Sequence, residues 1–326
     1  SDEGLLPNYA FPESGITLKS FINRKFNKGD DKNLDKGFKR YVYEYSRPAN
    51  SAISEFAPGN SFYADGRKVT IDRIDLNVSK KETWRLCPDC SHAELDKPDL
   101  ININCPKCDS PSWKDKGQVK NMIKLKPVYS TEDYEGSKSG DESDKRDNKY
   151  FVRKLFVGVN EEKDILNAFQ IEDENCAFGF EFVRDAVLRE INFGEKLGIG
   201  SGTKIAGKKE AVKGFEICKE CGKVQSNPKK PNHTYTCSLK NKEKDEVVEE
   251  ALYLYREFNS EAIRILIPAT TMEENEQVLQ SFIAAISLGL KKYFGSVEHI
   301  RTAITQEPIK GTELLKNYLV IYDSVP

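Results

Sequence analysis

The sequence predicts an α+β fold, made of small β-rich modules with two zinc knuckle or ribbon sites, followed by a mixed α/β C-terminal part. Seven of the eight cysteines fall into two groups that have the spacing of metal ligands. Short runs rich in aromatic and β-branched residues, which are typical of strands, occupy the middle of the chain. The last third combines helical periodicity with short apolar runs.

The composition is that of a globular chain without membrane segments. Of its 326 residues, 38% are hydrophobic and 31% are charged. No apolar run approaches the ~18 residues that a membrane helix needs. The first residues lack the basic and apolar parts of a secretory signal, and also an initiator Met. We therefore expect a cytoplasmic fragment of a longer protein, with no membrane partner.

Charge is distributed unevenly along the chain, although the formal net charge is only -2. The segment 204–244 holds eleven lysines and four glutamates, a local net of +7. Residues 245–326 carry thirteen acids and seven bases, a net of -6. This asymmetry predicts a basic face near the middle of the chain.

The N-terminal half is expected to contain an arm and a small module. Residues 1–46 are interpreted as a connecting arm, because prolines and a glycine interrupt them early. Residues 47–129 are expected to form a small β-module that carries the first cysteine group. In this module Pro48 suits the first turn of a short helix, and Asp65-Gly66 suits a type I′ hairpin turn.

The C-terminal half is expected to follow a linker. Residues 130–149 contain one aromatic and no aliphatic side chain, which predicts a disordered linker or loop. Residues 150–326 form the last predicted domain. Helical spacing predicts helices at 243–258 and 276–294. The apolar runs AIRILIP, at 262–268, and NYLVIYDSV, at 317–325, predict two buried strands.

The first cysteine group predicts a structural zinc ribbon. It has two CxxC pairs separated by fourteen residues: Cys87, Cys90, Cys105 and Cys108. Each CxxC turn delivers two thiolates from one tight loop, and two such loops complete a tetrahedral zinc site. Chance spacing or a redox pair is the alternative.

The second group predicts another closed zinc site. Its residues are Cys218, Cys221, His233 and Cys237, which offer three thiolates and one imidazole. The role of His233 stays open, since it could also be an exposed loop histidine. Cys176 belongs to neither group and is interpreted as a buried, inert thiol.

Catalytic signatures are weak. His92 and Glu94, followed by Cys105 and Cys108, resemble the pattern of zinc deaminases, but the spacing is wrong and Cys87 and Cys90 would have no purpose. The run GIGSGTK lacks the order of a phosphate-binding loop. His299 follows a predicted helix and is interpreted as structural. We therefore predict no catalytic residue in this chain.

Several stretches resemble one family. They are LLPNYAFP, RPANSAISEFAPGNSFYADGRKV, EICKECGKV with a downstream His and Cys, LYREFNSEAIRILIP and YLVIYDSVP. They look like the C-terminal region of bacterial superfamily 2 DEAD/DEAH-box helicases with an MrfA-like zinc-binding (MZB) domain, closest to the large anti-phage helicases of the Druantia or DISARM type. The resemblance implies that 150–326 is an MZB-like domain, truncated within its last motif. The ribbon at Cys87 to Cys108 is not part of that pattern.

The resemblance implies a non-catalytic, zinc-binding accessory region of an ATP-dependent DNA helicase, in phage defence or DNA processing. Its cofactors would be two structural Zn²⁺ ions, and ATP would bind only to absent motor domains. Expected partners are DNA or RNA, the motor domains of the parent chain, and other defence proteins. The alternative is a protein-interaction platform with purely structural zinc. The lysines expected to contact phosphates are those surrounding the second cysteine group, chiefly Lys208, Lys209, Lys229 and Lys230.

Overall fold

The computed structural model describes most of the chain: residues 15–25, 38–98, 103–139, 149–172, 178–197, 203–205, 208–225, 232–249, 252–267, 276–295, 297, 299–308 and 315–324. Cys176, Lys229 and Lys230 lie outside the described residues, as do residues 140–148 of the linker predicted at 130–149. The first residues of that segment instead form the end of strand β9 (Val128–Asp133), so the prediction of a disordered linker is wrong for them. Among the described residues, no helix has both the length and the apolar character that a membrane crossing requires.

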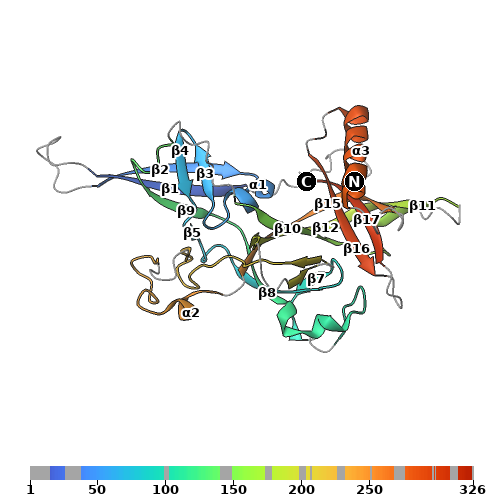
Figure 1. Cartoon of the computed structure of the whole chain (residues 1–326), viewed down its shortest axis with the longest axis horizontal. Helices are drawn as coiled ribbons and strands as arrows, with labels where there is room; N and C mark the ends of the chain where they lie inside the picture. Colours follow the sequence, from blue (N-terminus) through green and yellow to red (C-terminus); the bar gives the residue numbers. More distant parts are fainter. Residues whose placement is uncertain are drawn as a thin grey trace, which may run out of the picture.

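A four-stranded sheet forms the N-terminal part of the molecule (Figure 1). Its order is β2 (Phe38–Arg47), β1 (Ile16–Lys25), β9 (Val128–Asp133) and β5 (Arg73–Ile74). Strands β1 and β2 are antiparallel over ten residue pairs, and β9 runs parallel to β1. Strand β1 and all but the last residue of β2 lie within residues 1–46, where the sequence led us to expect a connecting arm, so that interpretation was wrong for them.

A helix and a hairpin cover one face of this sheet. Helix α1 (Ala49–Glu55) follows Pro48, as predicted. Strands β3 (Ser61–Ala64) and β4 (Arg67–Thr70) are joined at Asp65 and Gly66, whose φ angles of 50° and 67° are those of the predicted type I′ turn. The buried side chains of β1 pack against this helix and hairpin, in the core that they share with the start of β15.

A nine-stranded sheet forms the rest of the framework. Its path is β10-β12-β15-β8-β6-β7, with β11 on β12, β17 on β15 and β16 on β17. The strands span Lys81–Leu86 (β6), Ala93–Leu95 (β7), Val119–Lys124 (β8), Phe151–Gly158 (β10), Ile165–Gln170 (β11), Gly179–Glu195 (β12), Leu252–Ile267 (β15), Ile300–Pro308 (β16) and Leu315–Asp323 (β17). The long antiparallel pair β12 and β15 links the part of the sheet near the N-terminal module to the part formed by the last strands.

The elements of the last third differ in part from those predicted. Helix α3 (Glu276–Phe294) is confirmed, and its Leu279 packs on Leu319 and Ile321 of β17. The helix predicted at 243–258 is wrong, because only α2 (Lys244–Val247) is helical and β15 begins at Leu252. A small hairpin of β13 (Thr203–Ile205) and β14 (Lys208–Glu210) completes the fold. Strands dominate and helices are few, which confirms the predicted α+β class, while the predicted domain boundaries stay a prediction.

Candidate metal centres

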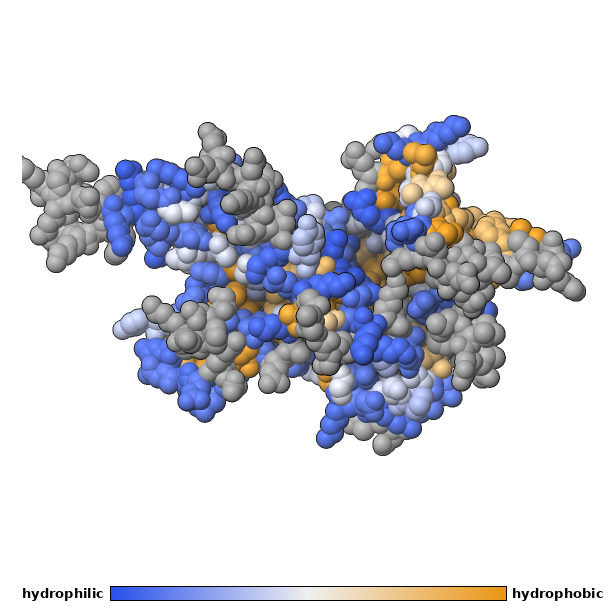
Figure 2. All heavy atoms as spheres, viewed as in Figure 1, coloured by the Kyte–Doolittle hydropathy of each residue, from blue (hydrophilic) through white to orange (hydrophobic). Residues whose placement is uncertain are grey.

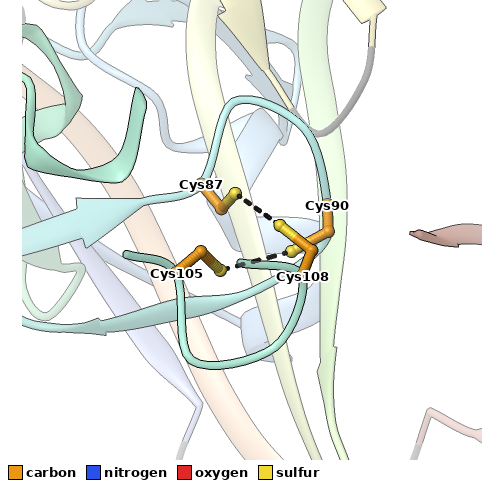
Figure 3. Close-up of side chains that lie close together, drawn as sticks. All are labelled: Cys87, Cys90, Cys105 and Cys108. Carbon is orange, nitrogen blue, oxygen red and sulfur yellow. Dashed lines mark hydrogen bonds between the residues drawn. The ribbon is translucent and has the colours of Figure 1, made fainter. Parts of the chain in front are cut away.

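The first cluster forms where two loops meet at the end of the nine-stranded sheet. Cys87 follows β6 directly, and the chain turns through Cys90 into β7, so this CxxC pair occupies a hairpin tip. The second pair, Cys105 and Cys108, lies in a tight turn in which the Asp109 N–H donates to the Cys105 carbonyl. Figure 3 shows the four side chains converging from these two loops.

The distances in this cluster fit a tetrahedral ion. Sulfur atoms are 3.6 Å apart between Cys87 and Cys108, and 3.7 Å apart between Cys90 and Cys105. All four lie within 4.8 Å of one another. Four thiolates at about 2.3 Å from one zinc ion would stand about 3.8 Å apart, whereas a disulfide needs about 2.05 Å. The cluster is therefore suited to a metal ion, and its cysteines are free thiols.

The first cluster sits in a packed environment. Cys87, Cys90 and Cys105 are buried together with Trp113, which follows the second loop in a 3₁₀ turn at Pro111–Lys114. The Ser110 hydroxyl donates to the Asp89 carboxylate and so joins the two loops. Burial excludes water from the sulfurs, which favours a closed structural centre.

Proton sharing among these sulfurs also favours a cation. Its hydrogen bond with Cys105 raises the pKa of Cys90, while a hydrogen bond with the same Cys105 lowers the pKa of Cys108. The four sulfurs therefore lie close enough to compete for protons. A divalent cation would stabilise four thiolates and release the remaining protons.

The second cluster forms on a short knuckle beside the four-stranded sheet. Cys218 and Cys221 lie on a turn closed by hydrogen bonds from Cys218 N to the Lys223 carbonyl and from Gly222 N to the Cys218 carbonyl. The sulfurs of Cys218 and Cys237 are 3.8 Å apart, and the four candidate ligand atoms lie within 4.8 Å of one another. Val247 packs against the two buried cysteines and closes the site.

His233 joins this cluster through its Nδ1 atom. That atom lies 3.3 Å from the Cys237 sulfur and 3.7 Å from the Cys221 sulfur. The Nε2 atom is buried and has no hydrogen-bond partner among the described residues. The geometry thus assigns the ligand position to Nδ1 and leaves the Nε2 proton for the outer side of the ring.

Other sequence candidates lie apart from the two clusters. His92 Nε2 and Glu94 Oε1 are 2.9 Å apart and bind each other, not the cysteines. Burial lowers the pKa of His92, which keeps the ring neutral. His299 is exposed on its side chain, and its carbonyl accepts hydrogen bonds from Ser324. This arrangement supports no deaminase-like site.

The lysines of the basic segment are dispersed. Lys208 and Lys209 lie on β14, whose hairpin is held beside the first cluster by an ion pair between Lys204 and Asp89. The sequence analysis expected these two lysines around the second cluster, and the structure instead places them beside the first. Lys209 is exposed.

The sequence analysis missed Gly222, which lets the second cluster pack against the four-stranded sheet. Gly222 has a φ of 70°, and a Cβ atom there would lie 2.1 Å from the Ile74 carbonyl oxygen. The knuckle therefore packs directly against β5, where Ile74 N donates to the Gly222 carbonyl. A glycine directly after CxxC was the available signal.

Comparisons with known proteins add little. No family model and no curated protein matches the chain. A similar solved structure is the crystal structure of the DUF1998 helicase MrfA bound to DNA, with 8% sequence identity and a TM-score of 0.33. The alignment covers 96% of this chain and 26% of that one, so the chain spans about a quarter of that protein's length. A similarity at this level does not establish a shared fold or function.

Proposed function

We propose that the chain is a zinc-stabilised, non-catalytic accessory region of an ATP-dependent DNA helicase, which contacts nucleic acid and anchors the motor. The observation that carries the proposal is the pair of closed four-ligand clusters built into a β framework. The sequence resemblance to helicase C-terminal regions adds the helicase context. Phage defence or DNA processing, in the cytoplasm, is the proposed setting.

Zinc is the ion that the two ligand sets suit best. Four thiolates, or three thiolates and one imidazole, are soft or borderline ligands in a tetrahedral set. Each cluster supplies all four positions from protein atoms, which leaves no position for a reactive water. The zinc ions would therefore hold loops in place and would not hydrolyse a substrate. Cys87, Cys90, Cys105 and Cys108 would hold one ion, and Cys218, Cys221, His233 and Cys237 the other.

Contact with DNA or RNA by the basic segment is a weaker part of the proposal. Several lysines of this segment form ion pairs, among them Lys213 with Glu216, and Lys223 with Asp72. Such pairs cancel much of the local net charge. Lys209 keeps an exposed side chain, and Lys229 and Lys230 retain the predicted role in phosphate binding.

A protein-interaction platform is the second candidate, and an exposed apolar surface favours it. Leu288 and Phe294 of α3 are 70% and 71% exposed, and Phe169 of β11 is 53% exposed. Figure 2 shows apolar residues gathered over α3 and the β11 hairpin. Such surface is often a docking face. The partner would be the motor of the same parent chain or another defence protein.

Binding measurements with the purified chain test the first proposal. The chain should bind labelled single-stranded or duplex DNA with an affinity that falls as salt rises, and it should not turn over ATP. Binding that is absent at 50 mM salt would remove the nucleic-acid role and favour the platform. Steady ATP hydrolysis that survives rigorous purification would contradict the non-catalytic assignment.

A further inference from the structure

The four-stranded sheet has one face that the core does not cover. Along β1 the buried side chains are Ile16, Leu18, Ser20 and Ile22, which point toward α1 and the β3–β4 hairpin. The alternate residues therefore point to the opposite face, since side chains alternate along a strand. Phe21 is among them, and it is only half-buried although it is a large apolar residue.

Two aromatic rings lie side by side on this open face. Phe21 of β1 and Tyr129 of β9 have ring centroids 6.1 Å apart and planes inclined by only 15°. The strand register supports this placement, because Lys19 is the partner of Tyr129 and Phe21 is the partner of Thr131. Neither ring belongs to the hydrophobic clusters of the described residues.

Two arginines flank the rings. The Arg73 guanidinium lies 4.1 Å from the centre of the Tyr129 ring, and the Arg40 guanidinium lies 5.6 Å from the centre of the Phe21 ring. Arg40 donates to the side-chain oxygen of Asn23, a neutral group, and no carboxylate among the described residues pairs with it.

The acids near this face are engaged with other groups. Glu44 pairs with Lys19 at 3.7 Å. Asp75 accepts a hydrogen bond of 2.9 Å from the Tyr129 hydroxyl, and Asp133 accepts one from the Glu135 N–H. Burial and the bond to Asp75 raise the pKa of Tyr129, so the ring stays neutral. The face therefore presents two neutral rings with an arginine beside each, and the Asp75 carboxylate lies at the hydroxyl end of Tyr129.

We propose that this face, defined by Phe21, Arg40, Arg73 and Tyr129, binds single-stranded nucleic acid by stacking unpaired bases on the rings and pairing phosphates with the arginines. Partly exposed rings on a sheet surface stack bases without regard to sequence, and arginines beside them contact the backbone or stack in turn. Paired bases in a duplex do not offer their faces, so single strands are preferred. The proposal rests on the nucleic-acid role proposed above, but it assigns that role to different residues.

The second metal cluster lies next to the strand that carries Arg73. Ile74, next to Arg73, is hydrogen-bonded to Gly222 of the knuckle. A cavity of about 440 Å³ is lined by residues of β5, including Arg73, and by Cys221 and Cys237. An ion in the second cluster would thus fix the strand that carries Arg73, which gives the structural zinc a role in nucleic-acid binding.

Ring-removing and ring-keeping variants test the proposal. Phe21→Leu and Tyr129→Leu keep apolar volume and lose the aromatic face, and Tyr129→Phe keeps the ring. The probe is a fluorescein-labelled 15-nucleotide poly(dT), with poly(rU) and a 15-base-pair duplex for comparison, measured by anisotropy. Each Leu variant should bind the single strands roughly tenfold more weakly, while Tyr129→Phe should bind like the parent. Val278→Ala, which changes an exposed residue of α3 that is not part of this sheet, is the matched control.

The folding of each variant and the site of nucleic-acid contact are measured in separate experiments. Thermal unfolding and zinc content should be unchanged in the variants used. Irradiation of the parent with a 5-iodouracil oligonucleotide should cross-link peptides that contain Phe21 or Tyr129. Parent-level affinity of both Leu variants, or cross-links confined to other peptides, would overturn the stacking face and leave the broader role intact. A parent chain that binds none of the three probes would instead overturn the nucleic-acid role itself, and the stacking face with it.

Discussion

Lys107 Nζ lies 2.6 Å from Glu307 Oε1, although the two residues are 200 positions apart in the sequence. Lys107 lies between the two cysteines of the second CxxC loop, and Glu307 lies on β16. Glu307 also accepts from Arg264 of β15 at 3.3 Å, and Arg264 is 2% exposed and paired with Glu181 of β12. The first metal cluster is therefore tied by charges to the C-terminal strands and is not an isolated knuckle.

We predict that Arg264 contributes more to the stability of the fold than Lys107 does. Arg264→Met leaves the partly buried Glu181 without its cation and leaves Glu307 with Lys107 alone, which should lower the free energy of unfolding by about 2–3 kcal/mol. Lys107→Met leaves Glu307 paired with Arg264 and should cost about 1 kcal/mol. Urea unfolding followed by circular dichroism measures both.

The matched control for the network is Lys242→Met. Lys242 and Glu246 form an exposed i,i+4 pair at 3.0 Å, and loss of such a pair should cost no more than about 0.5 kcal/mol. An Arg264→Met variant as stable as this control would show that the network adds nothing to stability.

Metal content provides a second prediction. The purified chain should contain two zinc ions, and Cys90→Ser and Cys237→Ser should each lose one, because they belong to separate clusters. Native mass spectrometry gives the count in each case, and elemental analysis identifies the metal. Retention of both ions by Cys237→Ser would argue that the second cluster does not hold its ion through that sulfur.

Gly222→Ala is predicted to weaken the second cluster without removing a ligand. A Cβ atom there would collide with the Ile74 carbonyl oxygen at 2.1 Å, and the φ of 70° is unfavourable for alanine. The variant should lose about 2 kcal/mol or more of stability and should release its zinc faster to a chelator. Gly117→Ala, where no atom lies within 4 Å of the new Cβ, should behave as the parent does.

The sequence predicted the clusters better than it predicted the sheets. The cysteine spacing predicted which residues meet, and the structure brings all eight predicted ligands together in two groups. Spacing succeeds because a CxxC turn is local. The support given by Trp113, Val247 and β5 depends on contacts distant in the sequence, and spacing carries no information about these.

The helix predicted at 243–258 shows why the rest could not be predicted. The apolar residues of this segment fit a helical stripe, yet the first five residues of β15, from Leu252, are all buried because elements cover both faces of the strand. A strand buried on both faces loses its alternation, and short apolar runs then fit either structure.

The connecting arm was misread for a related reason. Ile16, Leu18, Ser20 and Ile22 alternate correctly as buried residues. Phe21 hides this alternation because it is a large apolar residue on the open face. The residue that concealed the strand is the one to which we assign base stacking.

The last prediction concerns the lysines of the basic segment. Lys229→Glu combined with Lys230→Glu should weaken binding to every nucleic-acid sequence alike, since phosphate contacts carry no sequence information. The slope of log affinity against log salt should become shallower by about 0.7 per lost contact on single strands and about 0.9 on duplex.

Zinc content should not change, because neither lysine is a ligand. Lys242→Glu, which breaks a pair with Glu246, controls for the reversal of a lysine charge at another exposed position. If the double variant binds single and double strands as well as the parent at several salt concentrations, these lysines are a solvated surface. Single-strand affinity that the Phe21→Leu and Tyr129→Leu variants then lose would belong to the sheet face that carries these two rings.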